Sequence, residues 1–465
     1  MNKAAVAHPA SGGEQDGLPV PRRHWALAAI WIAVTMAVLD SSIANIALPT
    51  ISAELGASPS SAVWVVNAYQ IAIAMLLLSM ASLGERVGYR RVYLSGVAVF
   101  ACAFLGCALA GSLTALAIAR FIQGFGSAAI MAMNGALIRH TYPREGLARG
   151  IGYNALVVAI SSAAGPSVAA GLLAIATWRW LFAVNLPLAI VSIAIGIRAL
   201  PEARGGATRF DLPSALLNAV TFACVFMIGS DMAHATASLR TAGFAALGTM
   251  TGVILVRRGR RDENPLIPLD LIARPALRLS YLSSITAFAA QMIVLVTLPF
   301  RFQTGLGLSH VEIGLLITPL AVGTAIAAPI AGRLAGRPSS GPLAGIGMFV
   351  VALAFLSIAL LPASAGLIPC AVALAIGGMG FGLFQTPNNR IMLTMAPQRR
   401  SGAAAGMLAT MRIVGQTCGA IVAAAILRID GTNGALPLFV ASTFALVASV
   451  FAGARSQVSR MRLED

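Results

Sequence analysis

Asp40 and Arg120 are the residues of this chain whose presence packing explains least, because each lies within a long apolar stretch. A charged side chain at the centre of a bilayer costs roughly 2.5–3.5 kcal/mol on insertion scales. Burial disfavours the charged form of a carboxyl group, so Asp40 is a candidate to bind and release a proton near neutral pH. Such a group can couple a flow of protons to the movement of another solute. The alternative is a structural acid that is hydrogen-bonded to Ser41, Ser42 or Asn45.

Arg120 cannot lose its proton, and it therefore needs a partner inside the protein. We expect it to pair with an acid, for which Asp40 is the natural candidate, and to take part in proton coupling or conformational change. The alternative is a structural tie between helices that includes Gln123. Arg412 poses the same problem later in the chain. Because its own apolar stretch contains no acid, we expect Arg412 to bond backbone carbonyls or Gln416.

Fourteen apolar stretches, each near twenty residues long, must position these side chains. A helix needs roughly 20 apolar residues to cross a hydrocarbon core about 30 Å thick. The whole chain of 465 residues is 58% hydrophobic and only 10% charged, whereas a soluble domain has about 25% charged residues. We therefore predict an all-α polytopic membrane protein with 14 transmembrane helices. The expected spans are 25–48, 62–82, 92–111, 114–137, 149–173, 180–199, 212–230, 239–256, 279–300, 311–332, 342–361, 367–389, 403–427 and 434–454.

The 32 basic residues are distributed unevenly between the two sides of these spans. The N-terminal segment, alternate gaps and the C-terminal segment hold 26 of them, the opposite gaps hold four, and two lie within spans. The positive-inside rule then places both termini in the cytoplasm of a plasma (inner) membrane protein. The net charge of +16 is thus explained by the lipid bilayer, and we expect no nucleic acid partner.

The spans divide as six, two and six, which predicts the following organisation. Residues 1–23 form a disordered cytoplasmic tail, 24–200 a six-helix bundle, 201–257 two inserted helices, 258–278 a cytoplasmic linker, 279–455 a second six-helix bundle, and 456–465 a cytoplasmic tail. A weak internal repeat supports this division, because Ala81–Gly88 and Gly332–Ser339 follow the second span of each bundle with Leu and Arg in register. Parallel repeats of this kind characterise one large transporter architecture.

Six further segments occur in order along the chain, each on its expected span or loop. They are Leu39–Pro49, Ala81–Arg91, Arg120–Gly126, Gly165–Gly171, Trp178–Pro187 and Gly378–Asn389. Together they resemble the motifs of the major facilitator superfamily, specifically its fourteen-helix drug:proton antiporter branch. The likeness covers the chain from about residue 24. The loop at Ala81–Arg91 departs from the usual motif, with Glu85 in place of Asp and Tyr89 in place of Arg.

The resemblance implies two six-helix bundles with two inserted central helices, which move a solute by alternating access. It implies a proton-coupled secondary transporter that exports small amphipathic, cationic compounds (multidrug efflux, with a role in antibiotic resistance) and that is not an enzyme. Its energy source is the proton gradient rather than a cofactor. The resemblance implies that Asp40 and Arg120 couple transport to protons. It also implies that Glu85, Arg86 and Arg90 form a gate on the cytoplasmic side. The alternative for these loop residues is a set of topology-setting charges solvated by lipid headgroups.

Residues of other spans are candidates for bending a helix or for lining the substrate path. Gly165, Pro166 and Gly171 bend a helix and allow close approach of a neighbour. A set of polar, aromatic and basic side chains is the candidate lining of the substrate path: Tyr69, Gln123, Phe125, Asn134, Phe288, Gln385, Asn388 and Arg412. Gln385 and Asn388 have the alternative role of satisfying the carbonyls that Pro387 leaves free.

Other classes of protein fit the sequence less well. A major facilitator transporter dedicated to one specific metabolite is the nearest alternative. An integral-membrane enzyme would need clustered acids or histidines near one interface, whereas the five histidines are scattered over both sides. The five cysteines lie within apolar segments and are expected to pack as small hydrophobic residues, so we expect no metal. A channel would favour an oligomer, and we expect a monomer.

Overall fold

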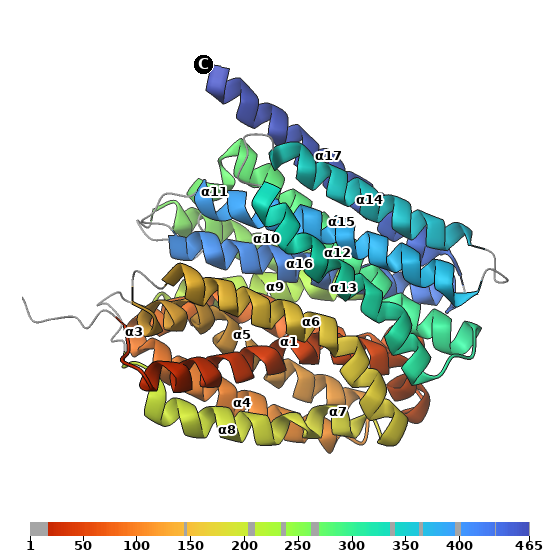
Figure 1. Cartoon of the computed structure of the whole chain (residues 1–465), viewed down its shortest axis with the longest axis horizontal. Coiled ribbons are helices and arrows are strands. Elements are labelled where there is room, and N and C mark those ends of the chain that lie inside the picture. Colours follow the sequence, from red (N-terminus) through yellow and green to blue (C-terminus); the bar gives the residue numbers. More distant parts are fainter. Residues whose placement is uncertain are drawn as a thin grey trace, which may run out of the picture.

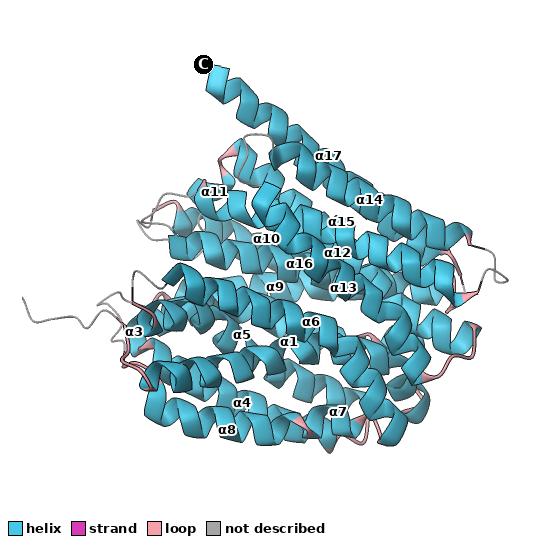
Figure 2. Ribbon diagram, in the orientation of Figure 1, coloured by secondary structure: helices cyan, strands magenta, loops and turns pink. Residues whose placement is uncertain are grey.

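The computed structural model describes residues 17–143, 147–202, 210–233, 239–261, 269–334, 340–361, 366–395, 401–432 and 434–464. Every regular element within these ranges is a helix (Figure 2). In a hydrocarbon environment only helices or closed barrels satisfy all backbone polar groups internally, which explains why long apolar stretches fold in this way. Fourteen helical segments of the described chain are long and apolar enough to cross a membrane, and the predicted number of spans is thereby confirmed.

The helices follow one another along the chain with short connections (Figure 1). The first half, a name used here for α1–α8, comprises α1 (Arg22–Glu54), α2 (Pro59–Ala62), α3 (Trp64–Val87), α4 (Tyr89–Ala108), α5 (Leu113–Thr141), α6 (Leu147–Ile175), α7 (Arg179–Ala183) and α8 (Asn185–Ala199). Then come α9 (Leu212–Ala233), α10 (Leu239–Gly259) and the short α11 (Leu269–Ile272). The second half comprises α12 (Pro275–Phe300), which runs on into the π-helical turn η2 (Arg301–Gly305), α13 (His310–Leu334), α14 (Ser340–Leu360), α15 (Leu367–Thr394), α16 (Ser401–Ile429) and α17 (Leu436–Glu464).

The pattern of neighbouring helices is the same in the two halves. α5 packs against α3 and α4 as α15 packs against α13 and α14, and α1 packs against α6 and α8 as α12 packs against α16 and α17. Figure 1 shows the two groups side by side, with the first half in red to yellow and the second in green to blue. Of the two inserted helices, α9 touches both α3 and α16, whereas α10 packs mainly on α9.

Paired glycines explain why these crossings are so close. A Cβ atom on Gly126 of α5 would lie 2.6 Å from the carbonyl oxygen of Gly96 on α4, and one on Gly380 of α15 would lie 2.6 Å from that of Gly347 on α14. Both helix pairs therefore meet backbone to backbone, which small residues permit in membrane proteins.

The turn between α3 and α4 depends on one glycine conformation. Gly88 has a φ of +105°, and its amide donates to the carbonyl of Gly84 at 3.0 Å. Side chains with a Cβ rarely adopt this φ, so glycine allows the chain to reverse there within a single residue. This turn holds part of the predicted loop motif.

Helices extend into parts of the two predicted tails. Of the expected disordered segment 1–23, residues 1–16 lie outside the described chain, but α1 already begins at Arg22, and the amide of Leu18 donates to the carbonyl of Thr141 at 3.0 Å. The expected tail over 456–465 continues α17 as helix to Glu464. Hydropathy marks only where a span leaves the membrane, and a helix does not have to end there.

Candidate functional site

Asp40 of α1 and Arg120 of α5 form an ion pair inside the first half. Arg120 Nη1 lies 2.6 Å from Asp40 Oδ2, and the side chains of Arg120 and Asp40 are 0% and 2% exposed. Gln123, one helical turn from Arg120, joins them both: its Oε1 accepts from Arg120 Nη1 at 2.7 Å and its Nε2 donates to Asp40 Oδ1 at 3.2 Å. The expected contact of Arg120 with Asp40 and the alternative tie to Gln123 are thus both present, in one network.

Two of the three alternative partners of Asp40 are bonded elsewhere. Ser41 donates to the carbonyl of Val38, and Asn45 donates to that of Ser41, so neither side chain is drawn to the carboxylate. The side chain of Ser42 lies outside the described structure. The described side chains that hold the carboxylate of Asp40 belong to α5, and the two helices are linked through it.

Aromatic and backbone groups of α3 complete the surroundings of Arg120. Its Nε donates to the carbonyl of Val65 at 3.0 Å, and its guanidinium lies 4.2 Å from the ring centre of Tyr69. The Tyr69 hydroxyl lies 2.7 Å from Ser127 Oγ. This proximity depends on Gly124, because a Cβ there would lie 2.6 Å from the carbonyl oxygen of Tyr69. The glycine brings α3 against α5, and the ring is placed over the cation as a result.

The predicted gate residues lie at the arginine-rich side, the side on which α1 begins and α3 ends. Arg90 donates to the carbonyl of Ile197 on α8 and pairs with Glu202, which lies three residues after the end of α8 and not in the second half. Glu85 and Arg86 are exposed. Their role as a latch between the halves stays a prediction, since the contact of Arg90 described here is made within the first half.

The two halves meet at the opposite side through α6 and α13. The Ser167 and Thr318 hydroxyls are 2.8 Å apart, and a Cβ on Gly314 would lie 2.9 Å from the carbonyl oxygen of Pro166. The predicted helix-bend segment thus packs against the other half, with Gly165 and Pro166 buried. Gly171 has nothing near its Cβ position, so the close approach comes from Gly314. That residue was not among the sequence candidates, because an isolated glycine near a helix start carries no motif.

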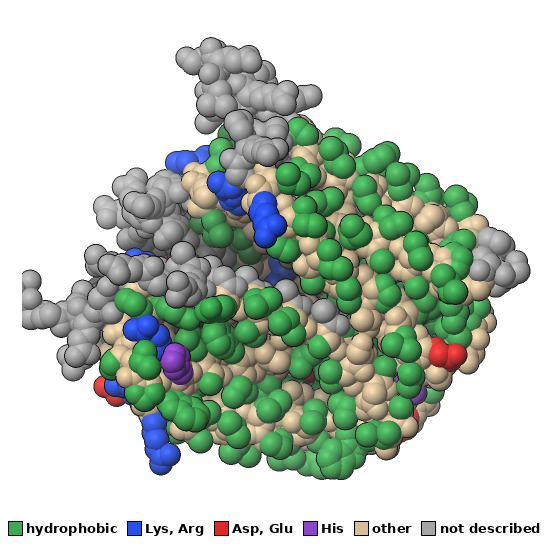
Figure 3. Space-filling model, in the orientation of Figure 1, with side chains coloured by type: hydrophobic (Ala, Val, Ile, Leu, Met, Phe, Trp, Pro, Cys, Tyr) green, Lys and Arg blue, Asp and Glu red, His purple; other side chains and the backbone are tan. Residues whose placement is uncertain are grey.

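The candidate path residues differ in how accessible they are. Four of them are buried, namely Tyr69, Gln123, Phe288 and Asn388. Three are half-buried, namely Asn134, Gln385 and Arg412, and Phe125 is exposed. Phe288 packs edge-on against Phe381 at 5.3 Å, and Phe125 packs against Phe121 at the same distance. Figure 3 shows a hollow between the two halves at the arginine-rich side, with basic side chains beside it. Whether these candidates line a substrate path stays a prediction.

Asn388 is hydrogen-bonded to residues of α12 and α17. Its Nδ2 donates to Ser284 Oγ at 2.8 Å and to the carbonyl of Ser280 at 3.3 Å, and its Oδ1 accepts from Arg455 Nη1. Arg455 is itself 0% exposed, and its Nε and Nη2 have no partner among the described residues. Arg455 is one of the 26 basic residues that the sequence places at the cytoplasmic side, because nothing in the local sequence shows that α17 turns this side chain inward.

Arg412 lacks the partners that the sequence led us to expect. Its Nε is buried without a hydrogen-bond partner within the described chain, and no ion pair or hydrogen bond joins it to Gln416 or to a described backbone carbonyl. It lies on α16, which packs against α3 of the other half, the helix that carries Tyr69. The ion pair of α1 with α5, Tyr69 of α3 and Arg412 of α16 are thus carried by helices that pack around α3.

A clasp at the opposite side joins the end of α1 to the start of α7. Glu54 Oε2 accepts from Trp178 Nε1 at 2.8 Å, its Oε1 pairs with Arg179, and the guanidinium lies 4.4 Å from a ring of Trp178. The hydrogen bond and charge of Arg179 keep the pKa of Glu54 below its ordinary value. The role of Glu54 was not visible from its own neighbourhood in the sequence.

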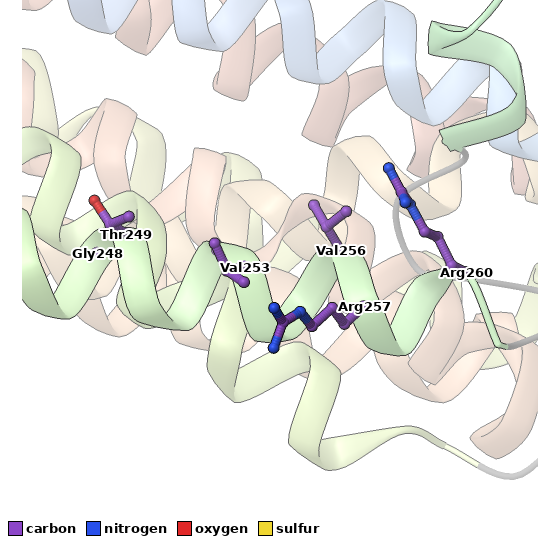
Figure 4. A pocket seen from close by; sticks show the side chains of 7 residues that line it. Gly248, Thr249, Val253, Val256, Arg257 and Arg260 are labelled. Atoms are coloured by element: carbon purple, nitrogen blue, oxygen red, sulfur yellow. The ribbon is translucent and has the colours of Figure 1, made fainter.

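A groove on α10 of about 450 Å³ lies away from these residues. It is lined by Gly248, Thr249, Gly252, Val253, Val256, Arg257 and Arg260 (Figure 4). All seven come from one inserted helix and the residue just after its end, and α10 packs mainly on α9. The groove therefore belongs to the outer surface of the inserted helices and not to the interface between the halves.

Comparisons with known proteins agree with this architecture. A sequence model of the Major Facilitator Superfamily matches residues 30–420 and 280–456. The chain is 46% identical to "Uncharacterized transporter YebQ" of Escherichia coli (strain K12), over 97% of this chain and 99% of that protein. It is 28% identical to "Riboflavin transporter RibZ" of Clostridioides difficile (strain 630), over 83% and 84%. It is 29% identical to "Tetracenomycin C resistance and export protein" of Streptomyces glaucescens, over 90% and 78%.

A solved structure shares the fold without close sequence similarity. It is a bacterial homolog of the human lysosomal transporter Spinster, in an inward-facing and unoccupied conformation. The TM-score is 0.68 at 13% identity, over 95% of this chain and 98% of that one. The arrangement of helices in the two chains is thus alike, although their side chains differ at most positions.

Proposed function

The chain belongs to the Major Facilitator Superfamily, and from that premise we propose that it is a proton-coupled exporter of small amphipathic compounds. As a member of this family it is a multi-pass membrane transporter and not an enzyme. We further propose that it resides in a bacterial inner membrane with both termini in the cytoplasm, because alternate connections carry most of the arginines. The observation that carries the proposal is the buried ion pair of Asp40 with Arg120.

Proton coupling follows from what a proton would do at this pair. When Asp40 is ionised, its charge compensates Arg120 and ties α1 to α5. When it is protonated, Arg120 loses its counter-charge and keeps only neutral acceptors, Gln123 and the carbonyl of Val65. Removing one partner of a buried pair typically costs about 3–5 kcal/mol, enough to favour a different packing of these helices. Binding of a proton is thereby coupled to the shape of the first half.

The packing supports alternating access as the transport cycle. The contacts of α6 with α13, at Ser167–Thr318 and at Gly314, lie toward the side opposite the arginine-rich one. At the arginine-rich side the surface is hollowed between the halves (Figure 3). A rocking motion that opened the first contact and closed the hollow would expose the interface to each side in turn.

Export is favoured over uptake by the resistance and export protein among the relatives. The riboflavin transporter favours the second candidate, a transporter dedicated to one metabolite. A dedicated transporter would move a single compound, whereas the proposed exporter would move several unrelated ones. Competition between chemically unrelated dyes for transport separates the two.

The proposal is tested in everted membrane vesicles with a fluorescent dye under an imposed pH gradient. We expect Asp40→Asn to abolish gradient-driven movement while the protein remains in the membrane, because asparagine cannot exchange a proton. The matched control is Asp430→Asn, which removes an exposed acid and keeps an oxygen to accept from the amide of Leu436. Unchanged gradient-driven transport by Asp40→Asn would remove Asp40 from the coupling mechanism.

A further inference from the structure

Charge in the interior of the protein is unbalanced. The acid of the described spans that lies deep in the helical core is Asp40, and it is already paired with Arg120. Asp231, buried at the end of α9, is bonded to Arg240 and Thr241 of α10. Neither carboxylate is therefore left to compensate a second cation within the membrane.

Arg412 is one such cation; Arg455 is another, but its Nη1 donates to Asn388 and Ser280, whereas no described residue accepts from Arg412. It lies twelve residues into the 29-residue α16 and is half-buried at the interface with the first half. A buried N–H without an acceptor costs about 1–3 kcal/mol, and more in a charged group. The described residues offer the guanidinium neither an acid nor a carbonyl. A protein that retained such a residue only for packing would do better with an apolar one.

The neighbours of Arg412 strengthen this imbalance. α3, against which α16 packs, carries Tyr69, and the guanidinium of Arg120 lies 4.2 Å from the centre of that ring. Two arginines, Arg120 and Arg412, therefore lie on helices that pack against α3, and the one deep carboxylate described among these helices is Asp40. The interface at this level is electropositive, which repels a cation and attracts an anion.

We propose that Arg412 binds the carboxylate of an amphipathic anionic substrate in the interface between the halves. The proposal rests on the transport function proposed above and specifies the charge of its substrate. A guanidinium presents two parallel N–H groups that match the two oxygens of a carboxylate. The apolar remainder of the substrate would lie against the hydrophobic residues of the interface. The family resemblance implies cationic substrates, but Asp40, the deep acid that could receive a cation, is already paired with Arg120.

An anionic substrate also changes how the membrane potential acts on transport. When one proton enters and one monoanion leaves, both movements carry positive charge toward the cytoplasm. The same proton exchanged for a monocation moves no net charge. The inside-negative potential of a bacterial membrane would therefore drive export of the anion, and would leave export of the cation unaffected.

Two xanthene dyes of similar shape and opposite charge provide the test: fluorescein, which is anionic, and rhodamine 123, which is cationic. Binding to the full chain in lipid nanodiscs is measured by fluorescence anisotropy, which needs no proton gradient. We expect the wild type to prefer fluorescein. Arg412→Gln should weaken fluorescein binding about ten- to a hundred-fold and leave rhodamine 123 unchanged or tighter. Arg412→Lys, which keeps the charge and loses the paired donors, should fall between.

The matched control is Arg428→Gln, the same substitution at an exposed position of the same helix, and it should retain the preference for fluorescein. A wild type that binds fluorescein no better than rhodamine 123, or not at all, overturns the proposal, as does an Arg412→Gln variant that keeps the preference. The Asp40→Asn variant separates this proposal from the previous one. If it binds fluorescein preferentially but still transports with the pH gradient, only the coupling role of Asp40 fails.

Discussion

The crossing of α3 with α5 in the first half and the crossing of α13 with α15 in the second share a backbone arrangement but not a chemistry. Gly124 of α5 corresponds to Gly378 of α15, and Gly126 corresponds to Gly380. The shift along the sequence is 254 residues in both cases (378 minus 124, 380 minus 126). Gly124 meets the carbonyl of Tyr69, and Gly378 meets that of Leu320. The same shift places Leu374 where Arg120 lies.

The difference separates two requirements on these helices. Close packing needs glycines in both halves, whereas charge is present only at the first crossing, where Arg120, Gln123 and Tyr69 stand in place of Leu374, Gly377 and Leu320. Leu374 is 0% exposed in an apolar core. One half thus carries the proposed proton site, and the other presents Arg412 of α16 to the interface.

The largest effect is expected when an arginine is placed in the second half at the position that corresponds to Arg120. We expect Leu374→Arg to destabilise the protein by roughly 2.5–3.5 kcal/mol, because no acid has been described at this position to pair with the new cation. Thermal unfolding in detergent measures the effect. Leu374→Met, which retains an apolar side chain of similar volume, is the control and should cost less than about 1.5 kcal/mol. A Leu374→Arg variant as stable as the wild type would show that this crossing tolerates an unpaired charge.

The shared backbone arrangement predicts a matched pair of glycine substitutions. A Cβ on Gly378 would lie 2.0 Å from the carbonyl oxygen of Leu320, and one on Gly124 would lie 2.6 Å from that of Tyr69. We expect each alanine variant to lose about 1–3 kcal/mol, with Gly378→Ala the more destabilised.

Gly171→Ala is the control for both variants, since nothing lies near its Cβ position. The same unfolding measurement ranks the three. Gly124→Ala should in addition weaken gradient-driven transport, because it displaces Tyr69 from Arg120, whereas Gly378→Ala has no such group beside it. Equal loss of transport in the two variants, at equal protein level, would contradict the assignment of charge chemistry to one half.

The smallest expected effect concerns the clasp of Glu54 with Trp178 and Arg179 at the ends of α1 and α7. The pKa of Glu54 is lower in the folded protein than its ordinary value of 4.5, so its contribution to stability is present above that pH and is lost as pH falls through the lower folded value. An exposed pair of this kind contributes about 1 kcal/mol or less. Glu54→Gln should therefore unfold at a slightly lower temperature than the wild type at pH 7, and the difference should shrink as pH falls below 4.5. A difference that does not shrink with falling pH would show that the ionised form is not the stabilising one.

The sequence of this protein by itself determined its class. Span number, helical structure and the candidacy of Asp40 follow from hydropathy and residue type, since the energy of placing a residue in a membrane depends mainly on that residue. The resemblance of Arg120–Gly126 to a known motif also held at the level of the family. Even the pairing of Asp40 with Arg120 was expected, because it joins one deep acid to one nearby base.

Only the tertiary structure decided which other polar groups meet. Asn388 lies buried against Arg455 and Ser284, Gly314 rather than Gly171 brings α13 onto α6, and Arg412 is left without an acceptor in the described chain. Such contacts join residues of different helices, and they depend on how far each helix is rotated and translated against its neighbours. That choice is made by side-chain packing over the whole bundle, to which the sequence near any one of these residues contributes only a small part.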